Sequence, residues 1–146
     1  MIDFSVFLQL HEIIPSVATC IVSKQLCTRP EADNHWALRD FAAKLMAQIC
    51  KTYTTTTNNI QVRVSQLYCS ALKQDKFPLS SEYGALTGLG VLGSEVIRVI
   101  IVPKVTDIGT KLEFCIEGVG HTQTDKTSAL KIKQLIVVRY SDKYSN

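Results

Sequence analysis

The sequence lacks an apolar run that could cross a bilayer. The runs from Ile13 to Val22 and from Val99 to Val102 fall far short of the roughly 20 residues that a transmembrane helix needs. The apolar N-terminus also lacks the basic segment of a secretory signal, and it carries Asp3 and Glu12 instead. We therefore expect a soluble chain with no membrane partner, folded as one domain around a real hydrophobic core.

The sequence also lacks the cysteine spacing of a redox or zinc motif, because none of its cysteines forms a C-x-x-C pair. The cysteines are odd in number, and most of them lie in apolar stretches that we expect to be helical. This usage is typical of reduced thiols in a cytosolic or nuclear protein. The cysteines are Cys20, Cys27, Cys50, Cys69 and Cys115.

Catalytic motifs are missing as well. His11, His35 and His121 stand in separate segments without an H-E-x-x-H pattern, and the sequence has no G-x-S-x-G motif and no P-loop. The glycines from Gly84 to Gly93 follow a helical spacing with apolar partners, which indicates packing and not a phosphate cradle. We therefore predict no catalytic residue, metal ligand, cofactor or small-molecule substrate.

Charge of one sign is scarce, with a formal net charge of only +3. Basic residues gather near the C-terminus, where a solvated helix face explains them best. A nucleic-acid-binding helical repeat that uses this stretch is the alternative function, and direct DNA contact stays open. The basic residues are Lys126, Lys131, Lys133, Arg139 and Lys143.

Helical periodicity covers most of the chain. The spacing predicts a helix over His35 to Tyr53 and another over Asn58 to Lys73, with Asn58 as the cap and the threonines before it as a break. A longer helical pattern runs from Ser94 to Gly118, and a weaker one covers Thr124 to Tyr140. Three apolar stripes are predicted to face the core: Leu38, Ala42, Leu45 and Ile49; Ile60, Val64, Leu67 and Ala71; and Ile97, Ile101, Val105, Ile108, Leu112 and Ile116.

An internal repeat organises these helices. Asp33, Ala42, Ala43 and Ile49 recur about 42 residues later, a period of HEAT and armadillo arrays. The element around Pro15 recurs at about two such periods, and both prolines must kink a helix or begin one. The later copies are Asp75, Gly84, Ala85 and Val91, and Pro103.

The fold class is therefore predicted as all-α, an α-solenoid of about three HEAT-type helical hairpins. Residues 1–118 form its core. Residues 119–146 form a weaker terminal helix and a basic tail that cap the same domain.

Asp33 and Arg39 match the pattern Asp-x5-Arg-x2-Ala-Ala, which resembles the HEAT consensus of an aspartate in the turn and an arginine early in the second helix. The second copy keeps Asp75 but has Ser81 in place of the arginine. Because the ladder from repeat to repeat is broken there, we interpret Asp33 and Arg39 as a local cap or a salt bridge. Such a pair is worth about 0–1 kcal/mol if exposed.

Longer strings of residues are specific to one family. The stretches Thr19 to Cys27, Asp33 to Ala43 and Thr55 to Gln61 resemble the C-terminal HEAT domain of a TBP-associated factor, and the similarity runs from about Leu10 to Ile108. That family carries an N-terminal histone fold, which this chain lacks. The resemblance implies a non-catalytic nuclear scaffold that binds other TFIID or SAGA-type subunits during assembly of the RNA polymerase II preinitiation complex.

Five polar or aromatic residues in two turns are candidates for protein interaction. Trp36 has two interpretations, a core anchor near the start of a helix or a hot spot for a partner. Turn and cap chemistry explains the others equally well. The candidates are Asn34, His35, Trp36, Asn58 and Asn59.

Overall fold

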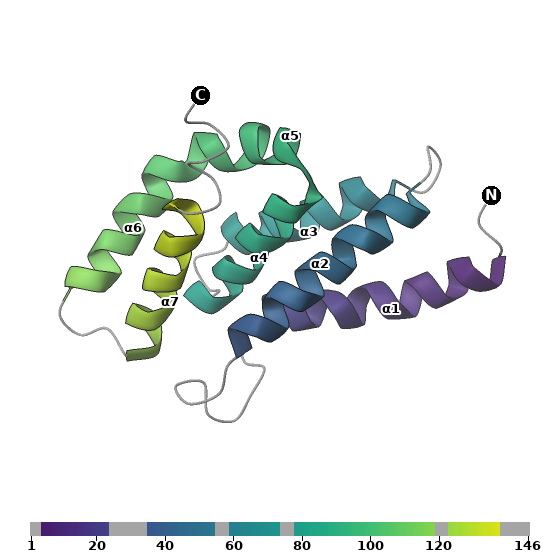
Figure 1. Ribbon diagram of the computed structural model, residues 1–146, viewed down its shortest axis with the longest axis horizontal. Coiled ribbons are helices and arrows are strands. Elements are labelled where there is room, and N and C mark those ends of the chain that lie inside the picture. The colour runs from purple at the N-terminus through teal and green to yellow at the C-terminus, as the bar shows by residue number, and fades with distance from the viewer. Residues whose placement is uncertain (1–3, 24–34, 55–58, 74–77, 119–122, 138–146) are drawn as a thin grey trace.

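The computed structural model describes residues 4–23, 35–54, 59–73, 78–118 and 123–137. Every element in these ranges is helical, which confirms the predicted all-α class (Figure 1). The α-helices are α1 (Phe4–Val22), α2 (His35–Tyr53), α3 (Ile60–Lys73), α4 (Leu79–Leu92), α5 (Ser94–Val96), α6 (Val105–Glu117) and α7 (Gln123–Leu135). A π-helix (Ile97–Ile101) and a 3-10 turn (Val102–Lys104) join α5 to α6.

The helices form three successive hairpins, as the solenoid prediction requires. The first is α1 with α2, the second is α3 with α4, and the third is the segment from α5 to α6 with α7. The second helices of the hairpins stack in the order α2, α4, α7, so α4 lies at the centre and also contacts α1 and α3 (Figure 1). Because neighbours surround α4, every residue from Leu79 to Leu89 is buried.

Small residues set the distances between these helices. Ala43 of α2 and Ala85 of α4 are completely buried. Gly84 lies against the end of α1, where an added Cβ would stand 1.8 Å from the carbonyl oxygen of Ile21. Gly88 lies against the ring of Tyr68, and a Cβ there would meet ring carbon Cζ at 2.4 Å. Gly84 and Gly88 thus allow α1 and α3 to approach the backbone of α4.

Two of the predicted apolar stripes include residues that are exposed in the structure. In α2, Leu38 and Leu45 are 43% and 41% exposed, whereas Arg39 is buried. The reason is that α2 packs on both α1 and α4, and these two neighbours cover an arc of α2 that is centred on Arg39 and Met46. In α3 the last three buried residues are Val64, Tyr68 and Ala71. Tyr68 is buried because its ring lies over Gly88, and Leu67 faces outward.

Helix starts and breaks follow local chemistry. The predicted bounds of α2 are confirmed, while α3 begins at Ile60, after Asn59 in the left-handed region with φ 49°. The backbone N–H of Gln61 donates to Thr54 Oγ1 at 3.2 Å, so the threonine segment supplies a cap, and Asn58 lies outside the described residues.

The two prolines of the repeat have different surroundings. Helix α1 runs through Pro15, whereas Pro103 lies in the 3-10 turn from which α6 starts. Proline has no N–H to donate to the helical ladder, which explains why the predicted long helix is interrupted there. Helix α6 then ends before Gly118, as the sequence predicts.

Helix α7 closes the described part of the third hairpin. It packs against α4 and α6, and it buries Ala129, Ile132 and Leu135. The predicted helix extends to Tyr140, but residues 138–146 lie outside the described residues. The capping role of 119–146 therefore stays a prediction.

Removing the hydroxyl of Tyr68 should leave the domain as stable or make it more stable. This side chain is completely buried, and its hydroxyl has no hydrogen-bond partner among the described residues. Burial raises the pKa of Tyr68, and the neighbouring Cys50 raises it further. We expect Tyr68→Phe to change the free energy of unfolding by between zero and a gain of about 1 kcal/mol in urea titrations.

The matched control for this prediction is Tyr83→Phe. The Tyr83 hydroxyl donates to Asp40 Oδ1 at 2.7 Å, so its removal should cost about 1–3 kcal/mol. Equal losses in the two variants would show that the Tyr68 hydroxyl has a partner after all.

Candidate functional site

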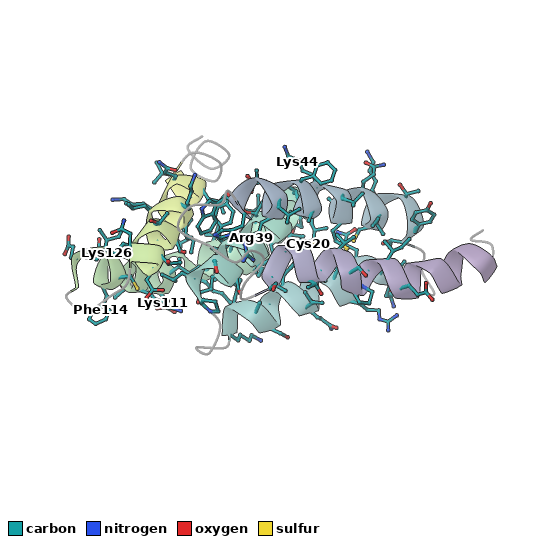
Figure 2. All side chains as sticks on the ribbon, turned by 90° about the horizontal axis from the view of Figure 1, so that it is seen from below. Cys20, Arg39, Lys44, Lys111, Phe114 and Lys126 are labelled. Atoms are coloured by element: carbon teal, nitrogen blue, oxygen red, sulfur yellow. The ribbon has the colours of Figure 1, made fainter. Side chains whose placement is uncertain are left out.

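A buried arginine ties the end of α1 to α2. Arg39 is 1% exposed, and its guanidinium donates to the carbonyl oxygens of Ile21 at 2.7 Å and Ser23 at 2.8 Å. The last carbonyls of a helix have no partner within the helix and carry partial negative charge, so a cation suits them. Arg39 points between the helices in Figure 2, consistent with these bonds. The cluster fixes the geometry of the first hairpin.

The second repeat contributes to the same carbonyl. Ser81 is the position that the repeat aligns with Arg39, and its hydroxyl donates to Ser23 O at 3.2 Å. The two aligned positions therefore converge on one acceptor, which joins the first hairpin to the second. Asp33, the expected partner of Arg39, lies outside the described residues, and so does Asp75, its copy in the second repeat. The value of about 0–1 kcal/mol for an exposed salt bridge does not apply to Arg39, because this side chain is buried.

His35 and Trp36 begin α2 and are buried, at 5% and 8% exposed. Trp36 packs edge-on against Tyr83 of α4 with ring centroids 5.0 Å apart, and His35 Nδ1 accepts a bond from Arg39 Nε at 3.1 Å. Their burial favours the core interpretation of Trp36, and a partner-binding role for His35 or Trp36 stays a prediction. Asn34 and Asn58 lie outside the described residues, and Asn59 is exposed.

Acid should weaken this cluster. Burial lowers the pKa of His35 below its ordinary value of 6.5, and the nearby Arg39 cation lowers it further. The unfolded chain therefore takes up a proton on His35 at a higher pH than the folded chain does. The contribution of neutral His35 to the free energy of unfolding is complete above pH 6.5 and is lost as the pH falls below it. We expect the urea midpoint of the wild type to fall between pH 7.5 and pH 5.5 by more than that of His35→Gln, whose amide oxygen can still accept from Arg39. Parallel midpoints would contradict this.

A buried carboxylate joins the third hairpin to the second. Glu82 of α4 is 3% exposed and forms a salt bridge with Lys111 of α6, whose side chain is about 40% exposed. Because the carboxylate is buried, the lysine cation offsets part of the cost of holding a negative charge inside the protein. This pair therefore positions α6 against α4.

The described residues contain no cluster of three or more metal-ligating side chains. None of the described helices combines the length and the hydropathy that a membrane span requires. The described cysteines, Cys20, Cys50, Cys69 and Cys115, are free thiols, and burial raises the pKa of Cys50 to about 11. A thiol with so high a pKa is a poor nucleophile at neutral pH.

The outer side of α2 carries apolar residues that the sequence analysis placed elsewhere. Phe41 is 67% exposed, and it lies on one side of the helix with the exposed Leu38 and Leu45. Lys44, in the same part of α2, points away from the helices in Figure 2. Spacing and hydropathy do not indicate this surface, because they favour burial of Leu38 and Leu45 over burial of Arg39.

A pocket of about 370 Å³ opens beside this surface. Its walls come from α2, from the first turn of α3 and from the last turn of α4. Lys44, Gln48 and Lys51 form one wall, and Val91 and Leu92 form the other. The pocket lining therefore combines apolar residues with two lysines and two glutamines.

Comparison with known proteins identifies the family. The sequence model of the TAF6 C-terminal HEAT repeat domain matches residues 4–106. The chain belongs to the TAF6 C-terminal HEAT repeat domain family. The match includes the Arg39 cluster, Gly84 and Gly88 of α4 and the pocket walls, and it ends near the start of α6.

Named relatives from three kingdoms of life share this domain. The chain is 55% identical to transcription initiation factor TFIID subunit 6 of Drosophila melanogaster over 90% of its length, and 44% identical to TFIID subunit 6 of Arabidopsis thaliana over 71%. It is 35% identical over 66% of its length to the SAGA complex/transcription factor TFIID complex subunit Taf6 of Schizosaccharomyces pombe. The chain spans about a fifth of each of these relatives, at 22%, 19% and 21%.

Proposed function

We propose that this chain is a non-catalytic scaffold domain of a TFIID or SAGA-type transcription factor subunit, which binds other subunits in the nucleus during assembly of the preinitiation complex. The similarity to TFIID subunit 6 proteins, at 55% identity over most of the chain, carries this proposal. The architecture agrees with it, since stacked hairpins offer a long surface whose exposed residues can vary without disturbing the core. The exposed apolar face of α2 supplies contact area of the kind that marks interaction sites.

Affinity capture from nuclear extract tests this function. The tagged chain of 146 residues should retain other TFIID or SAGA-type subunits at a salt concentration that removes non-specific contacts. Phe41→Glu and Phe114→Glu form a matched pair, because both rings are 67% exposed and stand on different helices, α2 and α6. Loss of subunits with Phe41→Glu alone would place binding on α2.

Failure to retain any such subunit would contradict the proposal. Retention that disappears after nuclease treatment would instead favour the nucleic-acid alternative, which relies on Lys126, Lys131 and Lys133 in the described part of the basic stretch. In that case the affinity for duplex DNA should fall steeply with salt, as counterion release requires.

A further inference from the structure

The pocket beside α2 has unpaired positive charge at its rim. Lys44 and Lys51 are exposed, and neither takes part in a salt bridge with another described residue. Three of the described acidic residues have partners elsewhere: Asp40 accepts a hydrogen bond from Tyr83, Glu82 pairs with Lys111, and Glu95 pairs with Arg98. The rim therefore favours a ligand that brings negative charge.

One side of the pocket is apolar and can hold an apolar side chain. Ala47 of α2 and Val91 and Leu92 of α4 line it, together with the thiol of Cys50. A phosphate backbone would satisfy the lysines but would leave this apolar surface without a matching contact. An apolar side chain between two carboxylates would satisfy both the surface and the lysines. The combination of lysines and apolar surface therefore favours an acidic peptide over a nucleic acid as the ligand.

The spacing of the lysines indicates the form of the peptide. Lys44 and Lys51 lie two turns apart on α2, which corresponds to about 10.5 Å along its axis. A helix lying along α2 repeats its own surface at the same interval. Two carboxylates seven positions apart on such a helix would therefore face both lysines, with the apolar residue between them directed at the pocket.

From this geometry we propose that the pocket between α2, α3 and α4 binds an acidic amphipathic helix of a partner protein. Its carboxylates contact Lys44 and Lys51, and one large apolar side chain enters between Ala47 and Leu92. Gln48 and Gln61 stand at the pocket as donors and acceptors for the polar edge of the helix. The inference names one surface of the proposed scaffold, and so it rests on that function.

Fluorescence anisotropy with a designed peptide tests the inference directly. The probe is a labelled helical peptide of about 16 residues with glutamates seven positions apart and Leu or Phe between them, and its counterpart has lysines in place of the glutamates. We expect saturable binding of the acidic peptide to the full chain and at least tenfold weaker binding to Lys44→Glu/Lys51→Glu. The basic peptide should bind this double variant better than it binds the wild type.

Two further variants separate charge from shape. Lys73→Glu/Lys133→Glu changes the net charge equally at exposed sites on α3 and α7, and it should bind the acidic peptide within about twofold of the wild type. Ala47→Phe fills the pocket without changing charge and should weaken binding at least tenfold. Thermal melting followed by circular dichroism checks that each variant is folded, and Lys44→Gln/Lys51→Gln replaces the charge reversal if that variant is not.

Equal binding of the acidic peptide to both charge-reversed variants would overturn the inference. So would a wild-type chain that binds single-stranded DNA through these lysines and leaves the peptide free. If the peptide fails while the chain still captures TFIID or SAGA-type subunits from extract, the pocket assignment is wrong and the scaffold function stands. If both experiments fail, the function itself is wrong.

Discussion

Replacing Gly84 with alanine should cost at least about 3 kcal/mol of the free energy of unfolding. The new Cβ would stand 1.8 Å from the carbonyl oxygen of Ile21 and 2.8 Å from its carbonyl carbon, and both atoms belong to backbone that cannot rotate away. Overpacking a core usually costs 1–3 kcal/mol, and a collision between two backbones lies at the upper end or beyond. The shift also moves the carbonyl that Arg39 holds at 2.7 Å. Urea titration followed by circular dichroism measures the loss.

Gly109→Ala is the matched control for this substitution. Gly109 lies inside α6, and a Cβ added there meets no atom within 4 Å. Replacing a glycine inside a helix with alanine typically adds about 0.5–1 kcal/mol of stability where the new methyl group has room. The two glycine substitutions should therefore change stability in opposite directions. Equal effects would mean that α1 does not approach α4 at Gly84.

The sequence was sufficient for the all-α class, and less so for the individual helices and their faces, since it predicted no bounds for α1 or α4. Spacing alone predicts the bounds of α2. It also predicts the repeated small residues Ala43 and Ala85, because helix contacts of the same kind recur along the chain. The faces depend on which neighbours are present. Hydropathy ranks Leu38 above Arg39, yet Arg39 is the buried residue, since its acceptors lie at the end of another helix.

The capping of α3 and the pocket show the same limit. The backbone N–H of Gln61 donates to Thr54, seven residues before it, so a residue outside the predicted helix supplies this cap. The pocket takes its walls from three helices, and nothing in the spacing of any one of them indicates it. Sites assembled from separate elements become visible only when the packing of those elements is known.

Arg39→Met should destabilise the domain by at least about 3 kcal/mol, because buried acceptors lose hydrogen bonds from a charged donor that are worth about 1.5–3 kcal/mol each. Methionine fills much of the same volume but offers no donor to the carbonyls of Ile21 and Ser23 or to His35 Nδ1. Arg39→Lys should recover only part of the loss, because a single ammonium lacks the planar fork that reaches both carbonyls. Arg98→Met, which removes an exposed arginine paired with Glu95, should cost no more than about 1 kcal/mol.

A double-mutant cycle with Ser81→Ala then tests whether the two repeats share one acceptor. Arg39 and Ser81 both donate to Ser23 O, so losing either one leaves the other to satisfy this oxygen. The double variant should therefore lose more stability than the sum of the single losses, with a coupling energy of about 0.5–3 kcal/mol. Strict additivity would show that the two side chains stabilise the junction independently. Coupling of the expected sign would establish that the end of α1 is the point where the first and second hairpins are joined.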